Sequence, residues 1–187
     1  MEQIEKIAES IAASPGQVVA VEVGDRDRVA DLVARLQPIY DYGYDADDGA
    51  DVRLALGSAC STLERALEHF AAAMQLPYGA ARTLWEFFEA VSQRPSAYRS
   101  CLVVADAAEL LADEDELMWR ALADELVDGP RCMGGGWDTL VLVDDHTGWA
   151  SSRFGSAADA ELAAKARLSS DEYAALQRGL ELRYRAD

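Results

Sequence analysis

The stretch best suited to contacting another molecule runs from Tyr78 to Glu89 and reads YGAARTLWEFFE. After its Tyr78-Gly79 turn, four apolar residues have the i, i+3, i+4 and i+7 spacing of a buried helical stripe. These residues are Leu84, Phe87, Phe88 and Val91. The remaining face of this short helix presents a guanidinium, an indole and two carboxylates, from Arg82, Trp85, Glu86 and Glu89.

Trp85 allows two interpretations. Exposed tryptophan is uncommon and tryptophan is enriched in the hot spots of protein interfaces, so Trp85 between carboxylates predicts a protein-recognition surface. Alternatively, another helix of the same chain covers the indole, as often happens to a single aromatic residue outside the buried stripe. The sequence leaves both interpretations open.

A second group of residues that could do chemistry follows two apolar runs. Asp106 ends the run CLVVA, and Asp144, Asp145 and His146 end the run TLVLV. Open parallel sheets commonly bind ligands at the carboxyl ends of their strands, which gives an alternative hypothesis of an enzyme or small-molecule sensor. That hypothesis requires a concave pocket among these side chains and at least one strongly shifted pKa. A simple surface turn explains the same residues.

Other signals indicate no bound metal or cofactor. Asp45, Asp47 and Asp48 cluster in a loop, but the spacing of an EF-hand is absent. The glycines at 134–136 precede a strand and are not followed by Lys-Ser/Thr, so they do not form a phosphate-binding loop. The three cysteines have neither disulfide nor zinc spacing. We therefore predict a protein without catalytic residues, metal or cofactor.

Hydrophobic periodicity predicts the elements that position these residues. Strands are expected at 18–23, 52–56, 101–105 and 139–143, with helices between them and helices at both ends of the chain. CLVVA is apolar throughout, as in a central strand covered on both faces. Local signals predict that Pro38 ends the second helix, that Ser61 and Glu64 form a capping box, and that Ser170 is an N-cap.

Composition limits the class of partner. The 187 residues carry 34 acidic and 17 basic side chains, a net charge of -17. Such a field repels nucleic acid and anionic membranes and attracts basic proteins. The N-terminus has no signal-peptide pattern, and no apolar run approaches the roughly 18 residues that span a bilayer. With the isolated cysteines, this predicts a cytoplasmic protein.

Three motifs lie in the predicted order of strands and helices, namely Gly57, Leu76-Pro77-Tyr78-Gly79 and Leu84-Trp85-Glu86. In these motifs and in the order of its elements, the segment 51–145 resembles the barstar family of ribonuclease inhibitors. It implies a small parallel sheet flanked by helices, and a protein that plugs the basic active site of a nuclease. Trp85 and Glu86 match the family's Trp-Asp pair, and Tyr78 and Gly79 match the Tyr-Gly of its binding loop. The family's preceding helix Asp aligns with Arg82 or Thr83.

The sequence therefore predicts an α/β fold with a small, mainly parallel sheet. Residues 1–50 are expected to form a helix-strand-helix extension, 51–145 the barstar-like core and 146–187 a helical extension packed on the core. The leading hypothesis is a non-catalytic inhibitor or immunity protein that binds a basic partner, a nuclease toxin, through Tyr78, Gly79, Arg82, Trp85, Glu86 and Glu89. A third hypothesis is a structural module that forms a homo-oligomer and buries Trp85 in its own interface.

Overall fold

The computed structural model describes residues 2–13, 17–41, 51–93, 100–127, 139–150 and 168–186, to which every structural statement refers. Three features of the sequence lie outside these ranges. They are the aspartate-rich loop at 45–48, the glycines at 134–136 with Cys132, and the helical pattern at 157–167.

The fold is α/β, as predicted, and is built on a parallel sheet of four strands in the order β1-β4-β3-β2. The strands are β1 (Gln17–Glu22), β2 (Asp51–Leu56), β3 (Ser100–Ala105) and β4 (Thr139–Asp144). All six residues of β4 are buried, because helices cover both faces of the sheet beside it. The expected strand positions are confirmed, and the N-terminal segment contributes the edge strand β1 to this same sheet.

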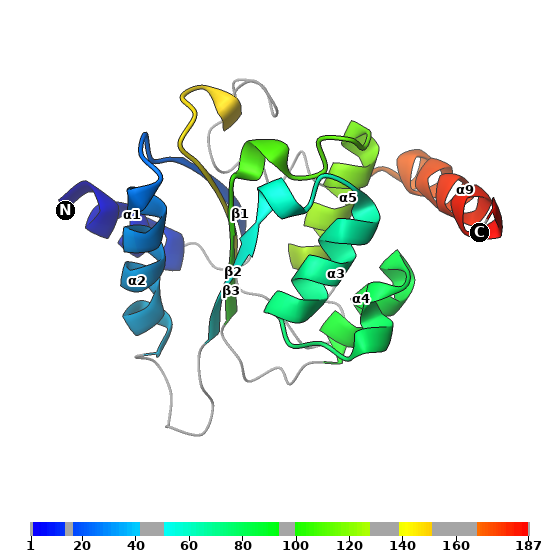
Figure 1. The fold of residues 1–187 in the computed structure, drawn as a ribbon, viewed down its shortest axis with the longest axis horizontal. Coiled ribbons are helices and arrows are strands. Elements are labelled where there is room, and N and C mark those ends of the chain that lie inside the picture. Colours follow the sequence, from blue (N-terminus) through cyan, green and yellow to red (C-terminus); the bar gives the residue numbers. More distant parts are fainter. Residues whose placement is uncertain are drawn as a thin grey trace.

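The helices form one layer on each face of the sheet (Figure 1). On one face lie α1 (Glu2–Ala12) and α2 (Asp27–Asp41). On the other lie α3 (Leu63–Ala73), α4 (Leu84–Ser92) and α5 (Glu116–Val127), with α9 (Ser170–Ala186) outside them. Successive residues of β3 point to opposite faces of the sheet. Val103 packs in the core on the α1 and α2 side, whereas Leu102 and Val104 pack in the core on the side of α3, α4 and α5.

Short 3-10 helices connect the main elements. They are η1 (Gly57–Ala59), η2 (Tyr78–Ala81) and η3 (Ala107–Glu109). Gly57, which the sequence identified as the end of a strand, must be glycine for a steric reason. A Cβ atom there would lie 2.2 Å from the carbonyl oxygen of Asp106, so only glycine lets the two strand ends approach this closely.

Three predicted helix ends differ from the structure by one to three residues. Helix α2 continues through Pro38 to Asp41, because proline has a helical φ and this one lies near the end of the helix. The N-cap of α3 is Thr62 rather than Ser61, since Thr62 accepts the backbone hydrogen bond of Arg65. Ser169, not Ser170, caps α9 by accepting the N–H of Glu172 at 3.3 Å.

Among the described residues, no helix has the length and apolar character needed to cross a membrane.

Candidate functional site

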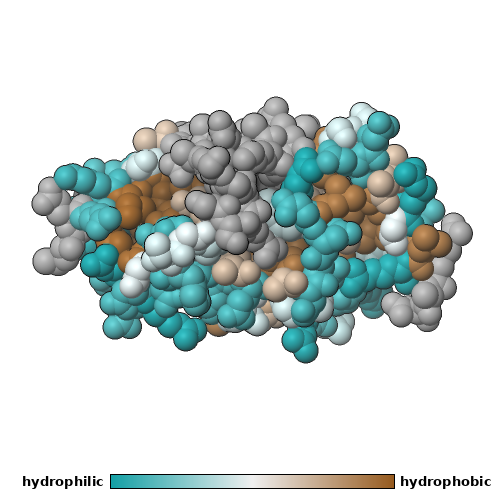
Figure 2. Space-filling view, turned by 90° about the horizontal axis from the view of Figure 1, so that it is seen from above, coloured by the Kyte–Doolittle hydropathy of each residue, from teal (hydrophilic) through white to brown (hydrophobic). Residues whose placement is uncertain are grey.

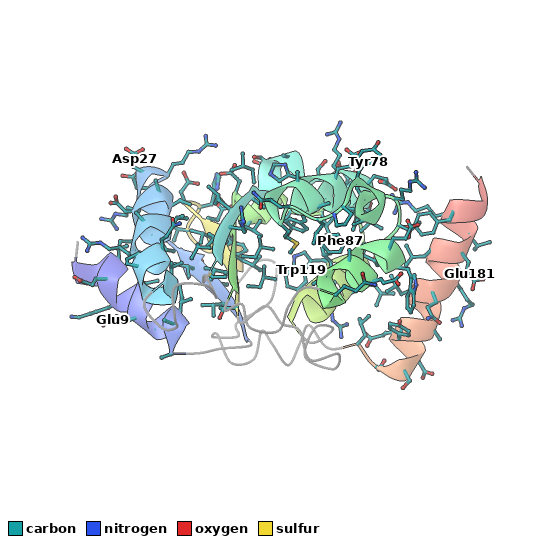
Figure 3. The ribbon with its side chains drawn as sticks, turned by 90° about the horizontal axis from the view of Figure 1, so that it is seen from below. Glu9, Asp27, Tyr78, Phe87, Trp119 and Glu181 are labelled. Atoms are coloured by element: carbon teal, nitrogen blue, oxygen red, sulfur yellow. The ribbon has the colours of Figure 1, made fainter. Side chains whose placement is uncertain are left out.

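Helix α4 is anchored firmly on one side. Leu84, Phe87 and Val91 are buried, and the ring of Phe87 lies 6.4 Å from that of Phe70, measured between centroids. In Figure 3, Phe87 and Trp119 point into the layer between α4, α5 and the sheet, whereas Tyr78 lies at the periphery. Three of the four residues of the predicted apolar stripe are therefore buried and fix which residues α4 turns outward, whereas Phe88 is only partly buried.

Trp85 and Tyr78 are the two most exposed aromatic side chains of the described residues, at 71% and 88%. The interpretation in which another helix covers the indole is therefore not what the structure has. Gly79, Arg82 and Glu89 are exposed as well. All these residues come from η2, α4 and the short connection between them, so they form one continuous surface, here called the α4 surface.

Glu86 is only partly exposed, because it also caps its own helix. Its backbone N–H donates to Thr83 Oγ1 at 3.2 Å, and the Thr83 hydroxyl donates to Glu86 Oε2 at 3.1 Å. Glu89 likewise accepts a hydrogen bond from Gln93 Nε2 at 3.3 Å. The sequence predicted these carboxylates as partner-binding groups and missed their local roles, although the T-x-x-E spacing of Thr83 and Glu86 was a readable capping signal.

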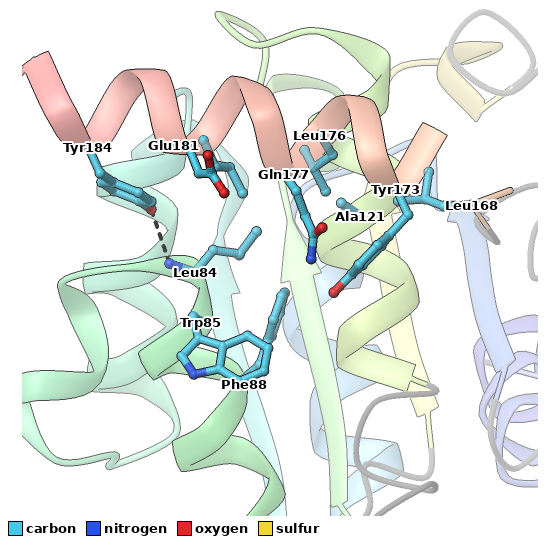
Figure 4. Close-up of a pocket in the computed structure, with 11 residues that line it drawn as sticks. Leu84, Trp85, Phe88, Ala121, Leu168, Tyr173, Leu176, Gln177, Glu181 and Tyr184 are labelled. Carbon is cyan, nitrogen blue, oxygen red and sulfur yellow. Dashed lines mark hydrogen bonds between the residues drawn. The ribbon is translucent and has the colours of Figure 1, made fainter. Parts of the chain in front are cut away.

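Helix α9 lies beside the start of α4 and adds a second wall to the α4 surface. The backbone N–H of Leu84 donates to the hydroxyl of Tyr184 at 3.1 Å (Figure 4). This bond satisfies one of the amide groups that every helix N-terminus leaves without an intrahelical acceptor. Burial raises the pKa of Tyr184, so the hydroxyl stays protonated at neutral pH.

A groove of about 490 Å³ opens between α4 and α9. Its lining residues are Leu84, Trp85, Phe88, Ala121, Leu168, Tyr173, Leu176, Gln177, Leu180, Glu181 and Tyr184. Figure 4 shows Trp85 and Phe88 on one side, with Tyr173, Gln177 and Glu181 extending from α9 on the other. Seen from above, apolar residues are visible among hydrophilic ones on the half of the molecule that carries α5 and α9 (Figure 2).

Two ion-pair clusters hold α9 in place. Arg183 binds Glu114 through both terminal nitrogens, at 3.0 and 3.1 Å, and its Nε lies 2.9 Å from Glu64. Burial raises the pKa of Glu114, but hydrogen bonds from Arg183 and from the backbone N–H of Leu63 outweigh it and lower the pKa on balance. Near the other end, Arg120 binds Glu172 at 2.6 Å and lowers the pKa of Glu172 to about 2, together with Ser169.

At the strand ends, two residues of the enzyme hypothesis, Asp144 and Asp106, accept hydrogen bonds from neighbouring parts of the fold. Asp144 is 2% exposed, and its Oδ2 accepts from the backbone N–H of Ala108 at 2.8 Å. Its Oδ1 accepts from the backbone N–H of His146 at 2.9 Å and lies 2.6 Å from His146 Nδ1. Asp106 accepts from the hydroxyl of Ser58 at 2.6 Å.

The electrostatics of this strand-end cluster follow from the same bonds. Burial raises the pKa of Asp144, but hydrogen bonds from Ala108 and His146 lower it on balance. The hydrogen bond to Asp144 raises the pKa of His146, whose side chain is largely exposed. Ligand atoms of Asp144, Asp145 and His146 lie within 4.8 Å of one another, so these three residues could hold one cation. Asp106 is tied to η1 instead, and the four residues do not act as one donor set.

No family model matches the chain, and no curated protein matches it. A chain in a structure of Drosophila ORC bound to DNA has a similar fold, with a TM-score of 0.51 and 14% sequence identity. The match covers 82% of this chain and 40% of that one, so this chain spans less than half its length. The similarity concerns the fold alone.

Proposed function

We propose that this protein is a non-catalytic inhibitor or immunity protein that binds a basic protein partner through the α4 surface. The observation that carries the proposal is the 71% exposure of Trp85 on a helix whose opposite face is fully anchored. A rigid, exposed aromatic residue loses little conformational entropy on binding and so contributes strongly to affinity. The net charge of -17 supports a basic partner, because complementary charge accelerates association and selects partners.

The barstar resemblance adds the class of partner, a nuclease toxin whose active site the α4 surface would mask. The four-stranded parallel sheet with helices on both faces is compatible with the fold that the resemblance implies. Tyr78 and Trp85, which match binding residues of the family, are the exposed aromatic residues of the surface. A cytoplasmic location belongs to the same proposal, supported by the free and buried thiols of Cys60 and Cys101.

The test is capture of a basic protein from a lysate of the source organism, followed by an assay of its nuclease activity with and without the purified inhibitor. Trp85→Ala should weaken capture and inhibition by about 30-fold or more, since truncating a central aromatic anchor costs about 2 kcal/mol or more of binding. Glu86→Gln should weaken binding while keeping the helix cap, because glutamine can replace glutamate in that role.

Leu182→Ala is a matched control, because Leu182 is 70% exposed on α9 and does not line the groove. It should bind and inhibit like the wild type. Unchanged binding by Trp85→Ala would refute the proposed site. A stable dimer in solution that Trp85→Ala dissociates would instead support the homo-oligomer hypothesis.

A further inference from the structure

The groove between α4 and α9 combines aromatic rings with a carboxylate. Four of its lining residues are aromatic, namely Trp85, Phe88, Tyr173 and Tyr184. Trp85 is 71% exposed and the two tyrosines keep 36% to 39% of their surface exposed, although large aromatic side chains are usually covered. Three exposed rings in one concavity form an apolar surface of the kind that marks interaction sites.

The floor of the groove is apolar, and its polar groups come from α9. Leu84 and Leu176 are buried beneath it, and Leu180 is half-buried beside them. Gln177 and Glu181 extend from α9 toward α4 (Figure 4). A ligand in this groove would therefore meet aliphatic and aromatic carbon over most of its length and a carboxylate on one wall.

We propose that this groove binds an arginine or lysine side chain presented by a basic protein. Both side chains have an apolar stem and a cationic head, which match an apolar floor and a carboxylate wall. Aromatic faces attract cations, with tryptophan the strongest, and Trp85 forms one side of the groove. The acidic field of the whole chain increases the local concentration of cations.

The walls of the groove are held before any ligand arrives. The N–H of Leu84 donates to Tyr184 at 3.1 Å, and Arg183 holds α9 on Glu114 and Glu64. Because these contacts fix the distance between α4 and α9, binding needs little rearrangement.

This assignment rests on the proposed function for the protein that presents the cation, whereas the chemistry of the groove can be tested alone. The probes are three capped peptides, acetyl-Gly-X-Gly-amide, in which X is arginine, lysine or norleucine. Norleucine has nearly the stem of lysine without the ammonium group. Binding is followed by NMR of the indole N–H signals of the four tryptophans, with Trp85 assigned from the loss of its signal in Trp85→Phe.

We expect the arginine and lysine peptides to shift the Trp85 signal saturably and to bind more tightly than the norleucine peptide. Glu181→Gln should weaken the two cationic peptides by about 2- to 5-fold and leave the norleucine peptide unchanged, as expected for loss of an exposed charge interaction. Leu182→Ala is the control and should change none of the three.

Equal binding of the norleucine peptide, or no effect of Glu181→Gln, would overturn the cation assignment in favour of an apolar ligand. Absence of any shift of the Trp85 signal would overturn the groove as a binding site. Binding of the cationic peptides without capture of a basic partner would retain the groove and reject the proposed function. Capture of a basic partner that depends on Trp85 but not on Glu181 would retain the proposed function and reject the groove as the cation site.

Discussion

The strand ends and the α4 surface use polar and apolar residues in opposite ways. At the strand ends, the buried carboxylate of Asp144 accepts hydrogen bonds from Ala108 and His146 and serves its own chain. On the α4 surface, Trp85 and Tyr78 remain exposed while polar bonds such as Leu84 to Tyr184 only hold the helices. The contrast is between a buried carboxylate that stabilises the fold and a surface whose aromatic side chains are open to solvent.

The largest difference in stability between the two regions is expected when one glycine of each is replaced by alanine. Gly57→Ala should destabilise the protein by about 3 kcal/mol, because the new Cβ would collide with the backbone oxygen of Asp106. Gly79→Ala should change stability by less than about 0.5 kcal/mol, since a Cβ there would meet nothing within 4 Å. Urea unfolding of both variants measures the difference. Similar losses in the two variants would remove the contrast between the regions.

Asp144→Ala should cost about 2 kcal/mol of unfolding free energy, because it leaves the backbone N–H groups of Ala108 and His146 without their acceptor. Trp85→Ala should leave stability within about 0.5 kcal/mol of the wild type, since the indole is exposed. Thermal and urea unfolding give both values. A large loss of stability in Trp85→Ala would mean that the indole is structural and would weaken its assignment to binding.

Tyr184→Phe should cost about 1 kcal/mol, the usual value of one neutral hydrogen bond. The amide of Leu84, which donates to the Tyr184 hydroxyl, should then exchange its hydrogen faster. Hydrogen exchange at Leu84 is the measurement, with the amide of Glu86 as an internal reference because it donates to Thr83 instead. Unchanged exchange at Leu84 would show that α9 does not cap α4 in solution.

The smallest change in stability is expected from lowering the pH. The pKa values of Glu114 and Glu172 are lowered in the folded protein, so their contributions to stability are present above their ordinary pKa of 4.5 and are lost as pH falls below it toward about 2. Helix α9 should loosen in this window. Glu172→Gln should flatten the decline of stability with acid, whereas Leu182→Ala, a change at an exposed residue of α9 that carries no titratable group, should not. Equal profiles for the two variants would argue against acid release of α9.

The sequence was sufficient to predict the features that depend on residues close together along the chain. The apolar stripe of α4 predicted which face packs on the core, and continuous apolar runs predicted the strands. The same pattern placed Trp85 off that face but could not tell whether another helix covers the indole. It was insufficient for contacts between distant residues. Nothing in the local pattern near Leu84 indicates that its N–H would bind Tyr184, 100 residues away. For that reason the groove between α4 and α9 could not be predicted from the sequence. The barstar resemblance did not indicate it either, because α9 lies beyond residue 145.

The pairing of β1 with β4 constrains how the chain can be made. These strands are neighbours throughout their length, from Gln17 opposite Thr139 to Glu22 opposite Asp144, yet most of the sequence separates them. On the ribosome, β1 must therefore wait for β4, which follows it in the chain only after β2 and β3. An incomplete chain that ends before residue 139 would leave β1 without its neighbour β4, so translational pausing or truncation between Glu22 and Thr139 should favour aggregation of the nascent chain.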